Sequence, residues 1–249
     1  MIDRFDRAAP RDLARIAGAL YLVNILAGFF AIGFVPAALG VSGDAAATAH
    51  NIQANELLFR AGLAAHVVVT MTNAPMAVIF YELFKVVSRR LASFVVVLMV
   101  MATAVEVANL LDQFSTLTLL DGSVFSSALP AGQLQALAYL PVAMQSVSYD
   151  ISTAFFGLNG LALGYLIYRS TFLPRLIGVL MVVDGLAYLV NSFAWFLAPG
   201  FAAHLFPYIQ LPALLGEGSL CLWLLIMGVN PARWDERASS AKAMQPAHA

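Results

Sequence analysis

The sequence predicts an all-α, polytopic membrane protein: a bundle of six transmembrane helices with short interfacial helices on the outer side. The chain of 249 residues is 61% hydrophobic and only 11% charged, with a mean hydropathy of +0.83, whereas about a quarter of a soluble domain is charged. A helix needs roughly 20 apolar residues to cross a hydrocarbon layer of about 30 Å. The sequence offers six such runs, near residues 14–37, 58–85, 91–118, 138–168, 173–197 and 206–228.

The distribution of basic residues predicts the topology. Of the 13 Lys and Arg residues, only Arg60 falls outside four alternate segments. These segments hold Arg4, Arg7, Arg11 and Arg15; Lys85, Arg89 and Arg90; Arg169 and Arg175; and Arg233, Arg237 and Lys242. By the positive-inside rule, both termini and the second and fourth connections are cytoplasmic. The predicted organisation is a cytoplasmic leader over 1–13, a six-helix transmembrane domain over 14–229 and a flexible cytoplasmic tail over 230–249.

The outer connections carry signals for short helices. Residues 38–57 contain the turn SGD followed by an Ala-rich run, which predicts a helix that begins after Asp44. Ser126 or Ser127 could begin another short helix before Pro141. Within the second span, Pro75 predicts a kink or local opening, because proline removes one helical hydrogen bond.

Composition and motifs exclude several classes of function. The net charge of −1 offers no basic face for a nucleic acid, so no nucleic-acid partner is expected. The single cysteine, Cys221, excludes an intramolecular disulfide and a CxxC motif. The sequence contains no HExxH, Walker or dinucleotide-binding motif, so no motif implies a cofactor. Expected partners are membrane lipids and a small amphiphilic ligand; the sequence does not predict an oligomeric state.

Ionisable side chains inside the predicted spans are the main functional signal. Each costs roughly 2.5–3.5 kcal/mol at the centre of a membrane helix, so each requires a partner or a role. Counting about 1.5 Å per residue from the basic end of each span places five polar side chains at the same depth, about 24–28 Å. These are His66, Glu106, Asp150, Asn191 and Glu217. We therefore expect Glu106, Asp150 and Glu217 to form one inward-facing cluster, which makes them the candidate catalytic residues.

Helical spacing extends this set of candidates. Glu106, Asn109 and Gln113 share one face of the third span, and Gln145, Ser148, Ser152 and Asn159 form a stripe on the fourth, with Asp150 at its edge. Large aromatic residues near this depth could form the apolar walls of a pocket. The predicted ligand-binding residues are His66, Glu106, Asn109, Tyr149, Asp150, Asn159, Tyr188, Asn191 and Glu217.

Several roles are compatible with this polar layer. The leading hypothesis is an outer-side pocket that binds or senses a small amphiphilic or lipid-like ligand. The alternatives are an intramembrane acid/base enzyme acting on a lipid or isoprenoid-like substrate, a proton-coupled transporter, and simple interhelical hydrogen bonding. No metal site is predicted, although His66, Glu106, Asp150 and Glu217 together offer nitrogen and oxygen ligands.

Several segments resemble a known family. The runs RIAGALYLVNILAGFF, NIQANELLFRAG, YDISTAFFGLNGLALGYLIYRSTFLPRLIGVL and GEGSLCLWLLIMGVN are similar to a bacterial membrane family, domain of unknown function four-three-eight-six, over about residues 14–230. The resemblance implies a bacterial membrane protein but no reaction, cofactor or substrate. We expect the protein to lie in the inner membrane. The resemblance places Glu56, Arg60, Glu106, Asn109, Asp150, Pro174 and Glu217 on motif positions. Asn159 and Gly218 depart from the family pattern.

Overall fold

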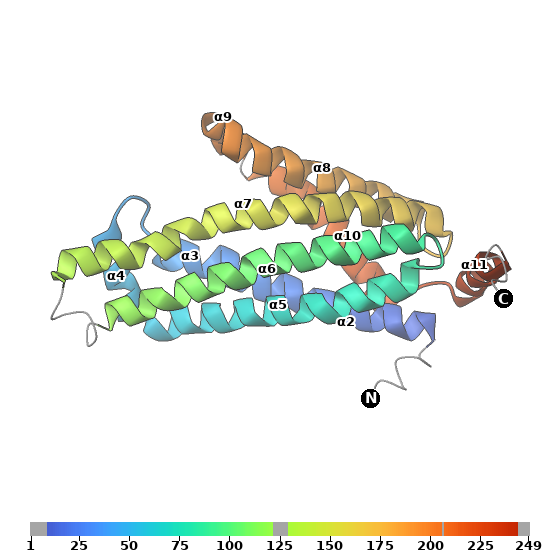
Figure 1. Ribbon diagram of the computed structural model, residues 1–249, viewed down its shortest axis with the longest axis horizontal. Helices are drawn as coiled ribbons and strands as arrows, with labels where there is room; N and C mark the ends of the chain where they lie inside the picture. The colour runs from blue at the N-terminus through green and yellow to red at the C-terminus, as the bar shows by residue number, and fades with distance from the viewer. Residues whose placement is uncertain (1–8, 122–128, 206, 244–249) are drawn as a thin grey trace. The chain divides into compact units, whose positions relative to one another are not determined.

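The computed structural model describes residues 9–121, 129–205 and 207–243, in which helices are the only regular secondary structure (Figure 1). The predicted positions Ser126 and Ser127 lie outside these residues. The helices are α2 (Pro10–Gly28), the π-helix η1 (Phe29–Phe34), α3 (Val35–Leu39), α4 (Ala45–Ala54), α5 (Glu56–Phe84), α6 (Arg89–Leu120), α7 (Ala131–Ser170), α8 (Arg175–Leu197), α9 (Pro199–Leu205), the 3-10 helix η2 (Tyr208–Gln210), α10 (Leu211–Ile226) and α11 (Pro231–Ala243).

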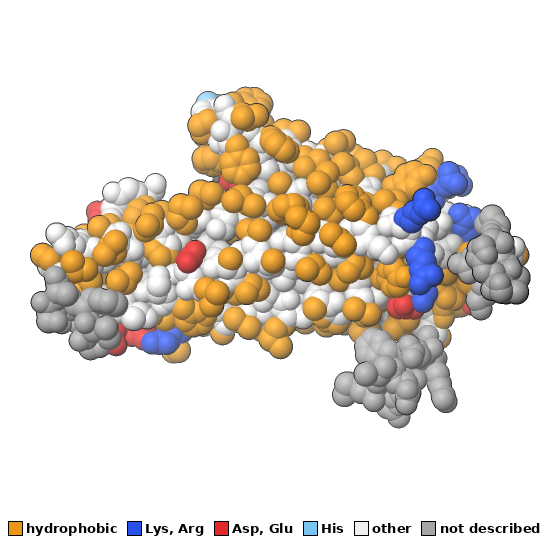
Figure 2. Space-filling model, in the orientation of Figure 1, with side chains coloured by type: hydrophobic (Ala, Val, Ile, Leu, Met, Phe, Trp, Pro, Cys, Tyr) orange, Lys and Arg blue, Asp and Glu red, His pale blue; other side chains and the backbone are white. Residues whose placement is uncertain are grey.

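Among the residues that the structure describes, six helical segments are long and apolar enough to cross a membrane, which confirms the predicted fold class. They cover Pro10–Leu39, Glu56–Phe84, Arg89–Leu120, Ala131–Ser170, Arg175–Leu197 and Tyr208–Ile226. Large apolar side chains point outward from these segments: Phe29 is 73% exposed and Leu111 70%. Figure 2 shows hydrophobic side chains over most of the visible helical surface. Such a surface suits contact with lipid tails, which are as apolar as leucine.

The chain divides into two compact units, to which α2, α5, α6 and α7 each contribute residues. Unit 1 comprises Met1–Leu22, Asn73–Ala102 and Thr153–Ala249. Unit 2 comprises Val23–Thr72 and Thr103–Ser152. Each unit is described below by itself.

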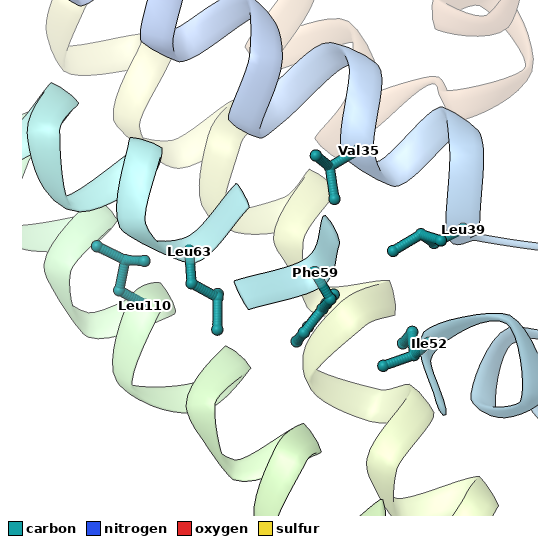
Figure 3. Close-up of a cluster of buried hydrophobic side chains, with 6 residues drawn as sticks. All are labelled: Val35, Leu39, Ile52, Phe59, Leu63 and Leu110. Atoms are coloured by element: carbon teal, nitrogen blue, oxygen red, sulfur yellow. The ribbon is translucent and has the colours of Figure 1, made fainter. Parts of the chain in front are cut away.

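The core of unit 2 is an apolar cluster drawn from four helices. Val35 and Leu39 of α3, Ile52 of α4, Phe59 and Leu63 of α5, and Leu110 of α6 are all buried, and Figure 3 shows their side chains converging. The predicted start of α4 is confirmed, because the side chain of Asp44 accepts a hydrogen bond from the backbone N–H of Ala47 at 2.9 Å. This cap satisfies one of the N–H groups that every helix start leaves unpaired.

Glycines set the packing of unit 1. Gly157, Gly160 and Gly164 of α7 lie against Gly178 and Gly185 of α8, and a Cβ on Gly185 would lie 2.5 Å from the carbonyl oxygen of Gly157. The sequence GLNGLALG therefore acts as expected: its small residues let two helix backbones approach closely.

The ends of the unit 1 helices are tied together by hydrogen bonds to backbone carbonyls. The Arg15 guanidinium donates to the carbonyl of Ile226, the last residue of α10. The indole N–H of Trp234 in α11 donates to the carbonyl of Leu83 at 3.0 Å, and the Arg233 guanidinium donates to that of Thr171. Residues 231–243, within the range expected to be a polar tail, thus form a docked helix.

Two prolines lie inside long helices. Residues 56–84 are helical through Pro75, and α7 continues through Pro141. Pro75 leaves the carbonyl at position 71 without its helical donor, and the hydroxyl of Thr72 donates instead to the carbonyl of Val69. The kink or local opening predicted at Pro75 stays a prediction.

Candidate ligand site

A polar cavity lies within unit 2, between α5, α6, α7 and the π-helix η1. It is small, with room for about one water molecule. It is lined by Ile32, His66, Glu106, Asn109, Gln145, Ser148, Tyr149 and Ser152. Seven of these eight side chains are polar. This region belongs to segments with the composition of membrane spans. A polar cavity in such a place is costly unless its groups are paired or used.

Three of the lining side chains have buried polar atoms without a hydrogen-bond partner. These atoms are Nδ1 and Nε2 of His66, Oε2 of Glu106 and Nδ2 of Asn109. All three residues are at least nine-tenths buried, at 4%, 7% and 3% exposure respectively. Leaving a buried donor or acceptor unsatisfied costs about 1–3 kcal/mol. The cavity therefore presents several unsatisfied polar atoms to anything that enters it.

Helical geometry explains why these groups converge. Glu106, Asn109 and Gln113 project from one face of α6, as their spacing predicts, and all three are buried. The amide of Gln113 donates to the side-chain oxygen of Asn109 at 2.6 Å, which leaves the Asn109 amide nitrogen to face the cavity. On α7, Gln145, Ser148 and Ser152 line the cavity from the stripe predicted for that helix.

Asp150, also on α7, is buried at 5% exposure but is not among the lining residues. It already has an interaction partner within the chain, as does Tyr149. Asp150 belongs to unit 2, as do His66, Glu106 and Asn109.

A second, mostly apolar cavity lies beside the polar one. It also has room for about one water molecule. It is lined by Ala31, Val35, Pro36, Leu39, Gly40, Thr48, Ile52, Phe59, Gly62, Leu63, Gln113, Val142 and Gln145. Gln145 lines both cavities. Gln113, on the apolar side, is hydrogen bonded to Asn109 on the polar side. The two cavities therefore share a boundary of amide side chains.

The predicted residues Tyr188 and Glu217 meet in a different cluster, within unit 1. The Tyr188 hydroxyl of α8 donates to Oε1 of Glu217 on α10 at 3.2 Å, and the Tyr21 hydroxyl of α2 lies near Glu217. Asp184, one helical turn before Tyr188, is 1% exposed, and its Oδ1 has no hydrogen-bond partner. A Cβ on Gly216 would lie 2.9 Å from the Cβ of Asp184. We call Tyr21, Asp184, Tyr188 and Glu217 the acidic cluster.

The depth predicted for Glu217 needs correction. That depth counts 16 residues back from Arg233, but α10 ends at Ile226, only nine residues beyond Glu217. Arg233 belongs to α11, after a turn. Asp184 likewise lies nine residues after Arg175, the first residue of α8, which explains why it lies beside α10 near Glu217.

The remaining predicted residues have structural partners. The Asn159 amide donates to the carbonyl of Val95 at 2.7 Å, which joins α7 to α6 within unit 1. Asn191 is buried and also has a partner within the chain. Within the described ranges, no group of three or more His, Cys, Asp or Glu side chains could hold a metal ion, so His66, Glu106, Asp150 and Glu217 do not form such a group.

Several site residues are absent from the predicted set. Gln145, Ser148 and Ser152 line the polar cavity, and the α7 polar stripe was the signal that could have included them. Ile32 also lines it, from the π-helix, and nothing in the sequence indicates a π-helix at that point. Asp184 was recognisable only as an ionisable residue in a span.

Comparison with known proteins identifies a family whose function is unknown. The model of a family described as Domain of unknown function (DUF4386) matches residues 16–228. A protein of Archaeoglobus fulgidus described as uncharacterized is 29% identical over 79 residues, which are 32% of this chain and 45% of that protein. The match thus spans less than half of that relative's length. No solved structure matches this chain.

Proposed function

The chain belongs to the DUF4386 family, and we propose that it is a multi-pass protein of the bacterial inner membrane that binds a small amphiphilic ligand in the polar cavity of unit 2. The observation that carries this proposal is the set of unsatisfied atoms on His66, Glu106 and Asn109, which line one cavity. A ligand that enters the cavity with its own donors and acceptors would satisfy atoms that the protein leaves unpaired.

The proposed orientation follows from the basic residues. Lys85, Arg89 and Arg90 lie at the α5–α6 connection, and Arg169 and Arg175 at the α7–α8 connection. The positive-inside rule places both connections, and both termini, in the cytoplasm. Glu106 lies 17 residues along α6 from Arg89, about 26 Å at 1.5 Å per residue. The polar cavity would therefore lie in the outer half of the membrane.

A second candidate function is an acid/base enzyme acting on the same ligand. It is favoured by the presence of an imidazole and a carboxyl group, His66 and Glu106, in one cavity, because these are the groups that most often transfer protons in active sites. In this case the ligand is a substrate, and a bound molecule would be converted rather than retained.

Native mass spectrometry of the full chain in lipid nanodiscs tests the proposal. We expect the purified protein to retain a small molecule, and Asn109→Leu to lose it, because leucine removes the amide that faces the cavity. Ala104→Leu, which introduces the same side chain at an exposed position of the same helix, is the matched control. Equal retention by the wild type and Asn109→Leu, with both correctly folded, would refute the proposal. Recovery of a chemically altered molecule only from protein with intact Glu106 would favour the enzyme.

A further inference from the structure

The acidic cluster of unit 1 places two carboxyl groups inside membrane-spanning helices, and the proposed function does not use it. Asp184 lies nine residues from Arg175, the first residue of α8, and Glu217 lies nine residues from Ile226, the last residue of α10. At 1.5 Å per residue each is about 14 Å from that helix end, near the middle of a hydrocarbon layer of about 30 Å. Ionisable groups are costly at this depth, which makes them candidates for a function.

Asp184 is the buried member of the pair. It lies on the side of α8 that meets α10, because a Cβ on Gly216 would lie 2.9 Å from the Cβ of Asp184. Its exposure is 1%, and its Oδ1 has no hydrogen-bond partner. A buried carboxylate without a donor is far more costly than a neutral carboxyl group in the same place. Asp184 therefore keeps its proton while α8 and α10 are packed together.

Glu217 is the charged member of the pair. It is partly exposed, and its Oε1 accepts a hydrogen bond from the Tyr188 hydroxyl at 3.2 Å, with the Tyr21 hydroxyl nearby. Hydroxyl donors favour the ionised form of a carboxyl group. Asp184 is close enough to Glu217 for their charges to interact, so a proton on one favours a negative charge on the other.

The surroundings of the pair supply no positive charge. The other titratable side chains near it are Tyr21 of α2, Tyr188 of α8 and Cys221 of α10, which are all uncharged when protonated. From α7, Gly160 lies against Gly185 of α8. Among the described residues, neither carboxyl group of the pair forms an ion pair with Lys or Arg. A bound proton is therefore the means by which one of the two negative charges is removed.

We infer that Asp184 and Glu217 form a proton-binding site with two positions, in which a proton held by Asp184 passes to Glu217 and leaves from there. In the transfer, the O–H bond of Asp184 breaks and an O–H bond forms on Glu217, directly or through one water molecule. The negative charge moves from Glu217 to Asp184 at the same time. Glu217 then releases the proton to water, because it is the partly exposed member. Uptake follows the reverse order.

Infrared spectroscopy of the full chain tests where the proton lies. The protein is held in a maltoside detergent, which has no carbonyl group to obscure the C=O stretching band of a protonated carboxyl group. At neutral pH, we expect Asp184→Asn to lose one such band relative to the wild type. Glu217→Gln should lose none, because Glu217 is ionised. Glu82→Gln, which replaces a carboxylate paired with Lys85, is the matched control and should also lose none.

The rate of exchange in heavy water tests the second position. Deuterium shifts the band of a protonated carboxyl group to lower frequency, so the shift records how fast the proton leaves. Glu217→Gln should slow the shift of the Asp184 band by about a hundredfold, the lower end of what a positioned acid or base contributes to proton transfer. Glu82→Gln should exchange at the wild-type rate.

Isotope labelling replaces Asp184→Asn as the test if that variant does not fold. Aspartate with ¹³C in its side-chain carboxyl group lowers the frequency of an aspartic acid band and leaves a glutamic acid band unchanged. Within the described residues, Asp150 is the other buried aspartate, so the labelled protein carries Asp150→Asn. The band should still shift with the label.

Three results would overturn the inference. The absence of an Asp184 band, or the loss of a second band in Glu217→Gln, would mean that the pair holds no proton or two. Unchanged exchange in Glu217→Gln would remove Glu217 from the route. A band that weakens when sodium replaces choline at constant pH would identify a cation site instead. Ligand retention by the polar cavity of unit 2 is measured separately, so failure here leaves the proposed function standing.

Discussion

Gly164 of α7 and Gly178 of α8 face each other so closely that a Cβ on either would lie 2.7 Å from the carbonyl oxygen of the other. The contact is between backbones, which cannot move aside as a flexible side chain could. These two helices of unit 1 can approach this closely because neither residue has a side-chain methyl group.

Gly164→Ala is expected to lower the stability of the protein by about 1–3 kcal/mol, the usual cost of forcing extra atoms into a packed interior. Gly178→Ala should act similarly. The double variant should cost less than the sum, because separating the helices once relieves both clashes. Unfolding in mixed detergent measures these changes. Gly218→Ala on α10, where a Cβ would meet nothing within 4 Å, is the control. Additive losses would contradict the shared contact.

The hydroxyls of Tyr21 and Tyr188 should support each other in stabilising the acidic cluster. The Tyr188 hydroxyl donates to Glu217, and the Tyr21 hydroxyl lies near it. Tyr188→Phe alone therefore leaves Glu217 one phenolic donor nearby and should cost about 0.6 kcal/mol, the average for hydrogen bonds between membrane helices in one measured protein. Removing both hydroxyls should cost more than the sum of the two single losses, because a partly buried acceptor on Glu217 is then left without a phenolic donor. A double-mutant cycle in unfolding experiments measures this difference. Tyr165→Phe, at an exposed tyrosine, should leave the stability unchanged. Strictly additive losses in the cycle would show that the two hydroxyls do not act together on Glu217.

Trp234 should hold α11 in place. Trp234→Phe keeps an aromatic ring but removes the N–H that donates to the carbonyl of Leu83, so we expect trypsin cleavage at Arg237 to accelerate about fivefold, the effect of about one hydrogen bond. Trp234→Ala should accelerate it further. Ser239→Ala, on the same helix at an exposed position, retains every cleavage site and should cleave like the wild type. Unchanged cleavage in Trp234→Ala would show that α11 docks without this residue.

Cysteine labelling in intact cells should show a cytoplasmic C-terminus. In a Cys221→Ala background, a cysteine at Ser240 should resist a membrane-impermeant maleimide, whereas cysteines at Ala46 and at Ser123 should react. Ser240 and Ala46 are exposed, and Ser123 lies outside the described residues. We expect this labelling pattern because Lys and Arg are concentrated in alternate connections, which the positive-inside rule assigns to the cytoplasm. Reaction at position 240 from outside the cell would reverse the proposed orientation.

The helices and the short-range contacts were predictable because they depend on neighbours in sequence. Hydropathy and length indicate all six spans. The cap at Asp44 depends on a side chain and an N–H three residues apart. The ion pairs of Glu56 with Arg60 and of Glu82 with Lys85 follow from helical spacing in the same way.

Contacts between helices were harder to predict, because they depend on where each helix ends. The face shared by Glu106 and Asn109 needs only the period of α6, and it was correctly inferred. The pairing of Glu217 with Tyr188 within the acidic cluster needs the position of the α10 terminus, which the nearest basic residue misplaces by seven residues. The cavity lining at Ile32 depends on η1, whose sequence FFAIGF is also compatible with an ordinary α-helix.

The π-helix at Phe29–Phe34 marks where the first span takes up one extra residue. A π turn holds about one more residue than an α turn, so deleting a single residue there would restore α geometry and leave α3 in nearly the same rotational phase as α2. Val35 and Leu39 would then still line the apolar cavity. A relative that lacks one residue in this segment can therefore keep the same cavity wall.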